Sequence, residues 1–209
     1  MIYVSHIFIV VYLCVLYSSH SVRLLASTLP TELGLLTNLK KFNATNAGII
    51  SGSIPSEFGN FVSLVTFDLY WNYLTGTIPS ELSSMVECEY FDVSAGYVSG
   101  PIPTDLSLLR SLVILKVYDN NITGTIPTEL SMLSSLVILK VFDNNITGTI
   151  PTELSLLSSL VYFEVEDNSI TGVIPSEFGN LSSLQYLEFA RNDLCKSYIY
   201  CRLLVRVIF

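Results

Sequence analysis

The chain has 209 residues, of which 50% are hydrophobic and only 13% are charged, so it holds enough apolar material for one continuous core. Its formal net charge of −8 leaves no cluster of Lys and Arg that could hold phosphates, and we expect no nucleic-acid partner. The two histidines, His6 and His20, both lie near the N-terminus, which removes the commonest catalytic and metal-binding groups from the rest of the chain. We therefore expect a protein that is not an enzyme and that has no cofactor and no metal site.

Residues 1–21 are predicted to be a secretory signal peptide. An apolar run from Ile7 to Tyr17 is followed by small polar residues, and Ser19 and Ser21 stand as a small-x-small cleavage site. No Lys or Arg precedes the run, so an uncleaved membrane anchor is the alternative, although the run falls short of the ~20 residues of a membrane span. We expect a secreted or cell-surface protein, with membrane contact only if this segment stays uncleaved.

Residues 22–194 are predicted to form about seven repeats of 24 residues. The period follows from an Ile-Pro step that recurs along the chain, and a fixed period of this length is typical of a solenoid. Pro30 precedes the second proline of the series by 25 residues, and every later spacing is 24. The series consists of Pro30, Pro55, Pro79, Pro103, Pro127, Pro151 and Pro175.

Each repeat predicts one strand and one short helix. In Leu139-Lys140-Val141-Phe142 apolar and polar residues alternate, which indicates a strand with Leu139 and Val141 pointing inward. The Pro-Thr-Glu-Leu segment that follows favours a helix start, because proline fixes φ and a carboxylate lies near the free amides. Strands ~4.8 Å apart on one side and wider helices on the other must curve the stack. The expected fold is an α/β curved solenoid with a parallel concave sheet and short 3-10 or α helices on the convex side.

The repeat has the pattern L-x-x-L-x-x-L-x-x-L-x-L-x-x-N-x-L-T-G-x-I-P, which is the leucine-rich-repeat pattern. The variant that ends in L-T-G-x-I-P resembles the plant-type extracellular repeats of receptor-like kinases, receptor-like proteins and polygalacturonase inhibitors, and also similar algal proteins. The resemblance covers roughly Leu29 to Leu194 and implies a binding function without catalysis. The repeat that begins at Pro127 matches the pattern with Leu130, Leu133, Leu136, Leu139, Val141, Asn144, Ile146, Gly148 and Ile150.

One asparagine column is predicted to be structural. Its amides can donate and accept at once, so they suit a turn that must satisfy buried backbone groups. Gly48 and Gly96 occupy the equivalent places in two repeats and cannot supply those bonds, so we expect the ladder to be weakest there. The column consists of Asn72, Asn120, Asn144, Asn168 and Asn192.

The outward positions of the strands form the candidate ligand-binding surface. Aromatic rings stand beside charges that change sign along the array, and such a mixture on a rigid concave sheet suits a protein, peptide or glycan ligand. The plainer interpretation is that aromatic residues favour strands whether or not anything binds them. We expect one continuous aromatic stripe beside a basic patch that gives way to an acidic one. The candidate residues are Tyr70, Trp71, Tyr90, Lys116, Tyr118, Lys140, Phe142, Tyr162, Glu164 and Tyr186.

Glycans and one disulfide are further expectations for an extracellular chain. Four sequons predict N-glycosylation at Asn43, Asn121, Asn145 and Asn180. Residues 195–209 read as a short C-terminal cap and tail, in which Cys195 and Cys201 are predicted to pair. Cys88 stands at an apolar repeat position, where a small buried hydrophobe is expected.

We interpret the chain as an extracellular recognition module for a protein, peptide or carbohydrate. The alternatives are a structural or adhesive surface protein, an inhibitor of a secreted wall-degrading enzyme and an ice-binding protein. The last rests on a repeated Thr-Gly-Thr track, for which local side-chain bonding in the turn is the competing explanation. The track consists of Thr75, Thr77, Thr123, Thr125, Thr147 and Thr149.

Overall fold

The structure, a computed structural model, describes residues 27–47 and 50–194. The predicted signal peptide and the predicted Cys195 and Cys201 pair lie outside the described residues. Within those ranges no helix is long and apolar enough to cross a membrane.

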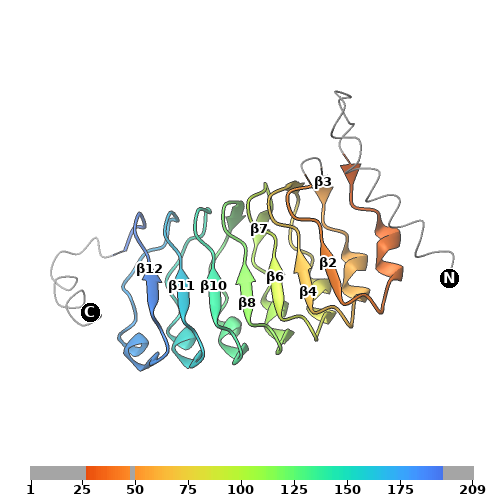
Figure 1. Cartoon of the computed structure of the whole chain (residues 1–209). Coiled ribbons are helices and arrows are strands. Elements are labelled where there is room, and N and C mark those ends of the chain that lie inside the picture. The colour runs from red at the N-terminus through yellow and green to blue at the C-terminus, as the bar shows by residue number, and fades with distance from the viewer. Residues whose placement is uncertain (1–26, 48–49, 195–209) are drawn as a thin grey trace.

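A parallel sheet of seven strands forms one face of the described chain (Figure 1), and each repeat contributes one strand to it. The register steps by one repeat from strand to strand, so that Leu139 lies beside Leu115 on one side and Phe163 on the other. In sheet order the strands are β2 (Lys41–Asn43), β4 (Thr66–Asp68), β6 (Tyr90–Asp92), β8 (Ile114–Lys116), β10 (Ile138–Lys140), β11 (Tyr162–Glu164) and β12 (Tyr186–Glu188).

Short strands on the side of the earlier repeats build two smaller parallel sheets. The first holds β1 (Ser27–Thr28), β3 (Ile50–Ser53) and β5 (Tyr73–Thr75), and the second holds β7 (Ser99–Pro101) and β9 (Asn121–Thr123). The chain therefore makes a second set of contacts between repeats on the side of the solenoid.

The helices of the described repeats are all 3-10 helices of five residues. Each follows a proline whose φ lies between −59° and −69°, which suits the first turn of a helix. The amide of Leu130 donates to the Pro127 carbonyl at 3.2 Å, a bond that spans three residues and defines the 3-10 form. These helices are η2 (Thr31–Leu35), η3 (Ser56–Asn60), η4 (Ser80–Ser84), η5 (Thr104–Leu108), η6 (Thr128–Met132), η7 (Thr152–Leu156) and η8 (Ser176–Asn180).

The core runs through the solenoid between the sheet and the helices. The inward positions predicted for the strand are confirmed, since Leu139 and Val141 are both fully buried, although the strand itself begins one residue earlier than expected. Cys88 is also fully buried, and burial raises the pKa of its thiol to about 12, so it is an inert apolar group. Near the N-terminal end phenylalanines replace leucines, and Phe58 and Phe61 pack with ring centroids 4.9 Å apart.

The asparagine ladder forms as predicted along the turn side of the core. Asn144 Nδ2 donates to the carbonyls of Val117 and Val141, both at 3.1 Å, and Asn144 Oδ1 accepts the amide of Ile122 at 2.9 Å. One side chain thus satisfies backbone groups in two successive repeats. Asn120, Asn168 and Asn192 repeat the pattern at similar distances, whereas Asn72 makes the Nδ2 bonds but its buried Oδ1 has no partner among the described residues.

Gly96 interrupts this ladder. The Val117 carbonyl accepts from two asparagines, Asn120 and Asn144, whereas the Val93 carbonyl accepts from Asn120. The left-handed residue of this turn is Ala95, with φ 57°, so no positive φ calls for glycine at position 96. A Cβ there would lie 3.2 Å from Asn120 Oδ1 and 3.3 Å from the Asn72 carbonyl oxygen, so a side chain would need these neighbours to shift slightly.

We predict that Asn144→Leu lowers the free energy of unfolding by ~1 to 3 kcal/mol. The substitution keeps the volume but leaves the Ile122 amide without its partner and takes one of two asparagine donors from the Val117 and Val141 carbonyls, and lost bonds of buried groups carry this cost. Denaturant titration of the secreted chain measures it, with Asn145→Leu at the exposed neighbouring position as the matched control. Equal midpoints for Asn144→Leu and the parent would contradict a structural role for the ladder.

Candidate functional site

Three aromatic rings of the concave face form what we term the Tyr118 stack. Tyr118 and Phe142 lie parallel, with ring centroids 4.4 Å apart and an interplanar angle of 10°. The ring centroids of Tyr70 and Tyr118 are 6.2 Å apart. The repeat between these two tyrosines carries the small, buried Ser94 at the same position. The residues occupy the same position of their repeats, because the 24-residue period fixes them in one column. Both rings of the central pair are half-buried, so the stack offers an apolar edge to a partner.

A second pair of rings lies in a different column. Tyr162 and Tyr186 stack at 4.3 Å with an interplanar angle of 4°, and we call them the Tyr162 stack. Tyr162 is in register with Ile138, four positions before Phe142, so the expected single stripe is instead two separate stacks. Residues that are 24 positions apart in the sequence share a column, whereas Phe142 and Tyr162 are 20 positions apart and do not.

Tyr90 and Lys116 converge on a buried carboxylate. Asp92 is 2% exposed, and its Oδ2 accepts the Tyr90 hydroxyl at 2.9 Å and lies 3.5 Å from Lys116 Nζ. Lys116 Nζ also donates to the Tyr90 hydroxyl at 3.2 Å. Burial, reinforced by Asp92, raises the pKa of the Tyr90 phenol, which keeps the hydroxyl a proton donor. The three side chains therefore satisfy one another and fix this part of the face.

The second lysine of the face is paired in the same way. Lys140 Nζ lies 2.8 Å from Glu164 Oε1 in the next repeat and 6.0 Å from the centre of the Tyr162 ring. The basic patch expected at Lys116 and Lys140 is neutralised, because each of these two lysines is paired with an acid from an adjacent strand. The unlike charges lie on neighbouring strands, where such pairs are favourable.

The C-terminal end of the concave face is acidic. Burial raises the pKa of Glu166, and the nearby charges of Glu164, Glu188 and Asp167 raise it further. Asp167 is paired with Arg191 of the following repeat. A partner that brings a positive charge to this end would relieve the repulsion.

Other proteins share this repeat pattern and this fold. The Leucine Rich Repeat family profile matches residues 63–85, 111–133 and 159–181, in phase with the turns described above. The repeats of this chain are leucine-rich repeats. No curated protein sequence matches the chain.

Solved leucine-rich-repeat structures show where the fold occurs. The Arabidopsis receptor kinase HAESA, in complex with the peptide hormone IDA and the co-receptor SERK1, is 32% identical with a TM-score of 0.74, and the match covers 80% of this chain and 28% of HAESA. The ectodomain of the Arabidopsis receptor kinase GASSHO1/SCHENGEN3, in complex with CASPARIAN STRIP INTEGRITY FACTOR 2, is 27% identical with a TM-score of 0.75 and coverages of 80% and 20%. This chain thus spans less than a third of either ectodomain.

A plant ice-binding protein shares the leucine-rich-repeat fold. It is 22% identical with a TM-score of 0.60, and the match covers 80% of this chain and 69% of that protein. The threonines of the predicted track are exposed on the side of the solenoid. Of the track, Thr147 donates its hydroxyl proton to the Gly124 carbonyl at 3.0 Å, and Thr171, at the same position one repeat later, donates to the Gly148 carbonyl at 2.9 Å.

The predicted glycosylation sites all have exposed side chains in the leucine-rich repeats. Asn121, Asn145 and Asn180 stand free of the core, and glycosylation there stays a prediction. Asn43 differs, because its Nδ2, the atom that would carry the glycan, donates to Asp68 Oδ2 at 2.9 Å. A glycan at Asn43 would leave Nδ2 a single hydrogen, which this bond would have to use.

An acidic column at the turns has a backbone explanation. Asp119, Asp143 and Asp167 all have φ of 53° to 54°, a left-handed conformation that Asp tolerates better than most residues. Within residues 27–47 and 50–194 no three His, Cys, Asp or Glu side chains are grouped so as to hold a metal ion.

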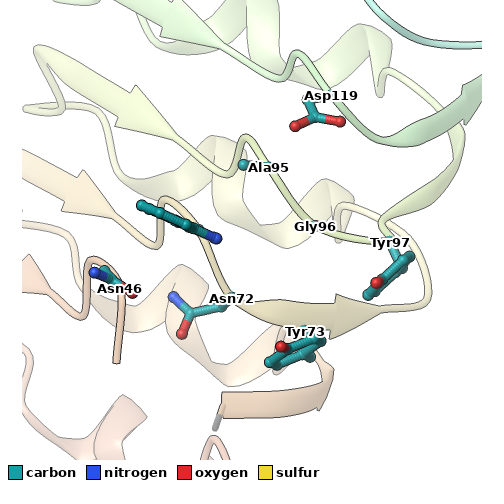
Figure 2. Close-up of a pocket in the computed structure, with 8 residues that line it drawn as sticks. Asn46, Asn72, Tyr73, Ala95, Gly96, Tyr97 and Asp119 are labelled. Carbon is teal, nitrogen blue, oxygen red and sulfur yellow. The ribbon is translucent and has the colours of Figure 1, made fainter. Parts of the chain in front are cut away.

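Sequence reasoning missed two exposed tyrosines beside a hollow at Gly96. Tyr73 and Tyr97 follow the turns of adjacent repeats, and the hollow lies between them and Trp71 (Figure 2). The available signal was the run Ser94-Ala95-Gly96, which departs from both neighbouring repeats. Trp71, predicted for the concave ligand surface, lies at this hollow and contacts the ring of Tyr70 at 6.2 Å.

We predict that Glu166→Gln raises the melting temperature at pH 7. The folded-state pKa of Glu166 is raised above its unfolded value, so ionisation disfavours the folded state, and stability is gained as pH falls through the raised pKa. The variant should therefore show a smaller gain in stability between pH 7 and pH 5 than the parent. Thermal melts across this range measure the difference. A variant that is less stable at pH 7 would contradict the assignment.

Proposed function

We propose that the chain is a non-enzymatic extracellular recognition module whose concave face binds an extended peptide or a protein segment. The observation that carries the proposal is the parallel pair Tyr118 and Phe142, 4.4 Å apart and half-buried at the centre of a rigid sheet. Aromatic side chains held in place at the middle of a surface are the usual anchors of binding, because they contribute large apolar area at little cost in entropy.

The charges around the anchor define the chemistry of the ligand. The pairs at Lys116 and Lys140 neutralise the middle of the face, whereas Glu166 and Glu188 leave its C-terminal end acidic. A ligand with an apolar or aromatic residue over the Tyr118 stack and a basic residue toward β12 would match both features. The charge difference between the two ends would set its direction.

The relatives support this class of ligand. The matched parts of HAESA and GASSHO1/SCHENGEN3 are leucine-rich-repeat ectodomains of plant receptors, and HAESA is in complex with a peptide hormone. The same likeness supports the proposed extracellular location. An adhesive protein or an inhibitor of a wall-degrading enzyme would use the same concave face on a protein partner, so these alternatives differ in the partner and not in the site.

Ice binding is a second candidate, favoured by the exposed threonine columns on the side of the solenoid. It needs a flat array of hydroxyls and no anchor on the concave face. Thermal hysteresis of the secreted chain, compared with Thr125→Lys and Thr149→Lys, tests it. Activity that these variants abolish would replace the concave-face proposal by this one.

We predict that Tyr118→Ala with Phe142→Ala weakens peptide binding by more than ~2 kcal/mol, the usual cost of removing central aromatic anchors. The probes are peptides selected on the secreted chain from a random twelve-residue library, and calorimetry measures their affinity. The fold should be retained, because the core residues of these strands are Leu115 and Leu139.

Two control variants locate the site. Thr125→Ala with Thr149→Ala changes the side of the solenoid and should leave peptide affinity unchanged. Tyr162→Ala removes the Tyr162 stack alone and separates its contribution from that of the Tyr118 stack. Equal affinity of the parent and the Tyr118 and Phe142 double variant would refute the proposal.

A further inference from the structure

A run of three small residues carves a hollow into the side of the solenoid. Ser94-Ala95-Gly96 stands where the preceding repeat has Tyr70-Trp71-Asn72 and the following repeat has Tyr118-Asp119-Asn120. Two turns with large side chains therefore flank a turn whose side chains are small or absent. The hollow has a volume of about 420 Å³, within the range of small-molecule sites.

Three exposed aromatic rings border this hollow (Figure 2). Trp71, Tyr73 and Tyr97 are 58%, 54% and 52% exposed, which is far more than such residues need for packing. Tyr73 and Tyr97 lie nearly parallel, with centroids 6.1 Å apart and an interplanar angle of 19°. The hollow therefore has two aromatic platforms, the Trp71 indole and the tyrosine pair.

The turn of each described repeat requires a left-handed residue, and at Trp71 a bulky ring holds this position. The same turn position is held by Asn46, Asp119, Asp143 and others, and all have φ near 50°. Asn and Asp tolerate this left-handed conformation, whereas a bulky ring at φ 58° is an outlier. Strain of this kind marks functional positions, because the turn alone would favour a different residue.

The polar groups of the hollow suit a neutral, hydroxyl-rich ligand. Asp119 is the single charged side chain of the lining, so an anionic ligand would meet only repulsion. The Asp119 carboxylate can accept hydroxyl protons, and the Asn46 amide and the Trp71 indole N–H can donate to hydroxyl oxygens. The aromatic faces are electron-rich and attract the C–H faces of a sugar ring.

We propose that this hollow is a binding site for a neutral oligosaccharide, distinct from the Tyr118 and Phe142 pair of the concave face although Trp71 touches Tyr70 at the border between them. A pyranose ring has an apolar C–H face and a rim of hydroxyls, which matches an aromatic platform beside a carboxylate and an amide. Two platforms suit successive units of one chain. A single cationic group of a peptide is the competing occupant, since Trp71 and Asp119 could together hold it.

Trp71 is the sole tryptophan of the chain, so its fluorescence reports on this hollow directly. We titrate the secreted chain with cellohexaose, laminarihexaose and chitohexaose, with a hexameric oligogalacturonide as the anionic control and tetralysine as the cationic one. We predict a saturable blue shift of the Trp71 emission with at least one neutral hexasaccharide. Neither charged probe should produce it.

Two variants that keep the reporter test the site. Tyr97→Ala removes one ring of the tyrosine pair. It should weaken binding of the responsive hexasaccharide about tenfold or more, as the loss of an aromatic anchor does. Ala95→Asp places in the hollow the side chain that the next three repeats carry at this position, where φ 57° suits Asp. This variant should fold normally and lose binding.

Phe142→Ala on the concave face is the matched control and should leave saccharide affinity unchanged, so failure of the peptide site and of this site are distinguishable. No shift with any neutral hexasaccharide, or a shift with tetralysine alone, would overturn the proposal in favour of no ligand or of a cationic one. Parent-like affinity of both Tyr97→Ala and Ala95→Asp would show that the saccharide binds elsewhere.

Discussion

The solenoid depends on a single recurring bond pattern in which the asparagine ladder satisfies backbone groups that neither strand nor helix can pair. Asn144 alone bonds to the carbonyls of Val117 and Val141 and to the amide of Ile122, and so joins two repeats through one side chain. No single repeat can bury its apolar face or complete these bonds, so stability resides in the contacts between neighbours. The outward positions of the strands take no part in this and are free to carry other chemistry.

The same constraint forces every outward residue into a column with its counterparts about one strand spacing away. A recurring aromatic therefore becomes a stack, as at Tyr118 and Phe142, and a recurring acid becomes a row of repelling charges. The concave face resolves most of that repulsion by changing sign between strands, with Lys140 beside Glu164. Glu166 forms no ion pair with a described residue, and burial, together with the like charges around it, raises its pKa.

The repeat, the strand direction and the ladder could be predicted from the sequence because each follows from residues that recur in phase. Leu139 and Val141 point inward as the alternation indicates, and Asn144 makes the bonds that its place predicts. The prediction of one continuous aromatic stripe was wrong because Phe142 and Tyr162 are 20 residues apart and not 24. They therefore occupy different positions of their repeats and lie in different columns. The prediction of a basic patch was wrong for a related reason, since the net charge of the surface around a lysine depends on the acids of adjacent strands, which the sequence of a single repeat does not include.

The hollow at Gly96 could not be predicted from one repeat at a time. It forms because the turn at residues 94–96 has smaller side chains than the corresponding turns of the two neighbouring repeats. Gly96 gives up a ladder side chain, and the Val93 carbonyl is left with one asparagine donor where Val117 has two. A lost bond of this kind costs about 1 kcal/mol, and the left-handed tryptophan adds strain, so neither change helps the chain to fold. The lost ladder bond at Gly96 and the strained backbone at Trp71 lie at adjacent turns and border the same hollow. A ligand explains these two costs better than the stability of the solenoid does.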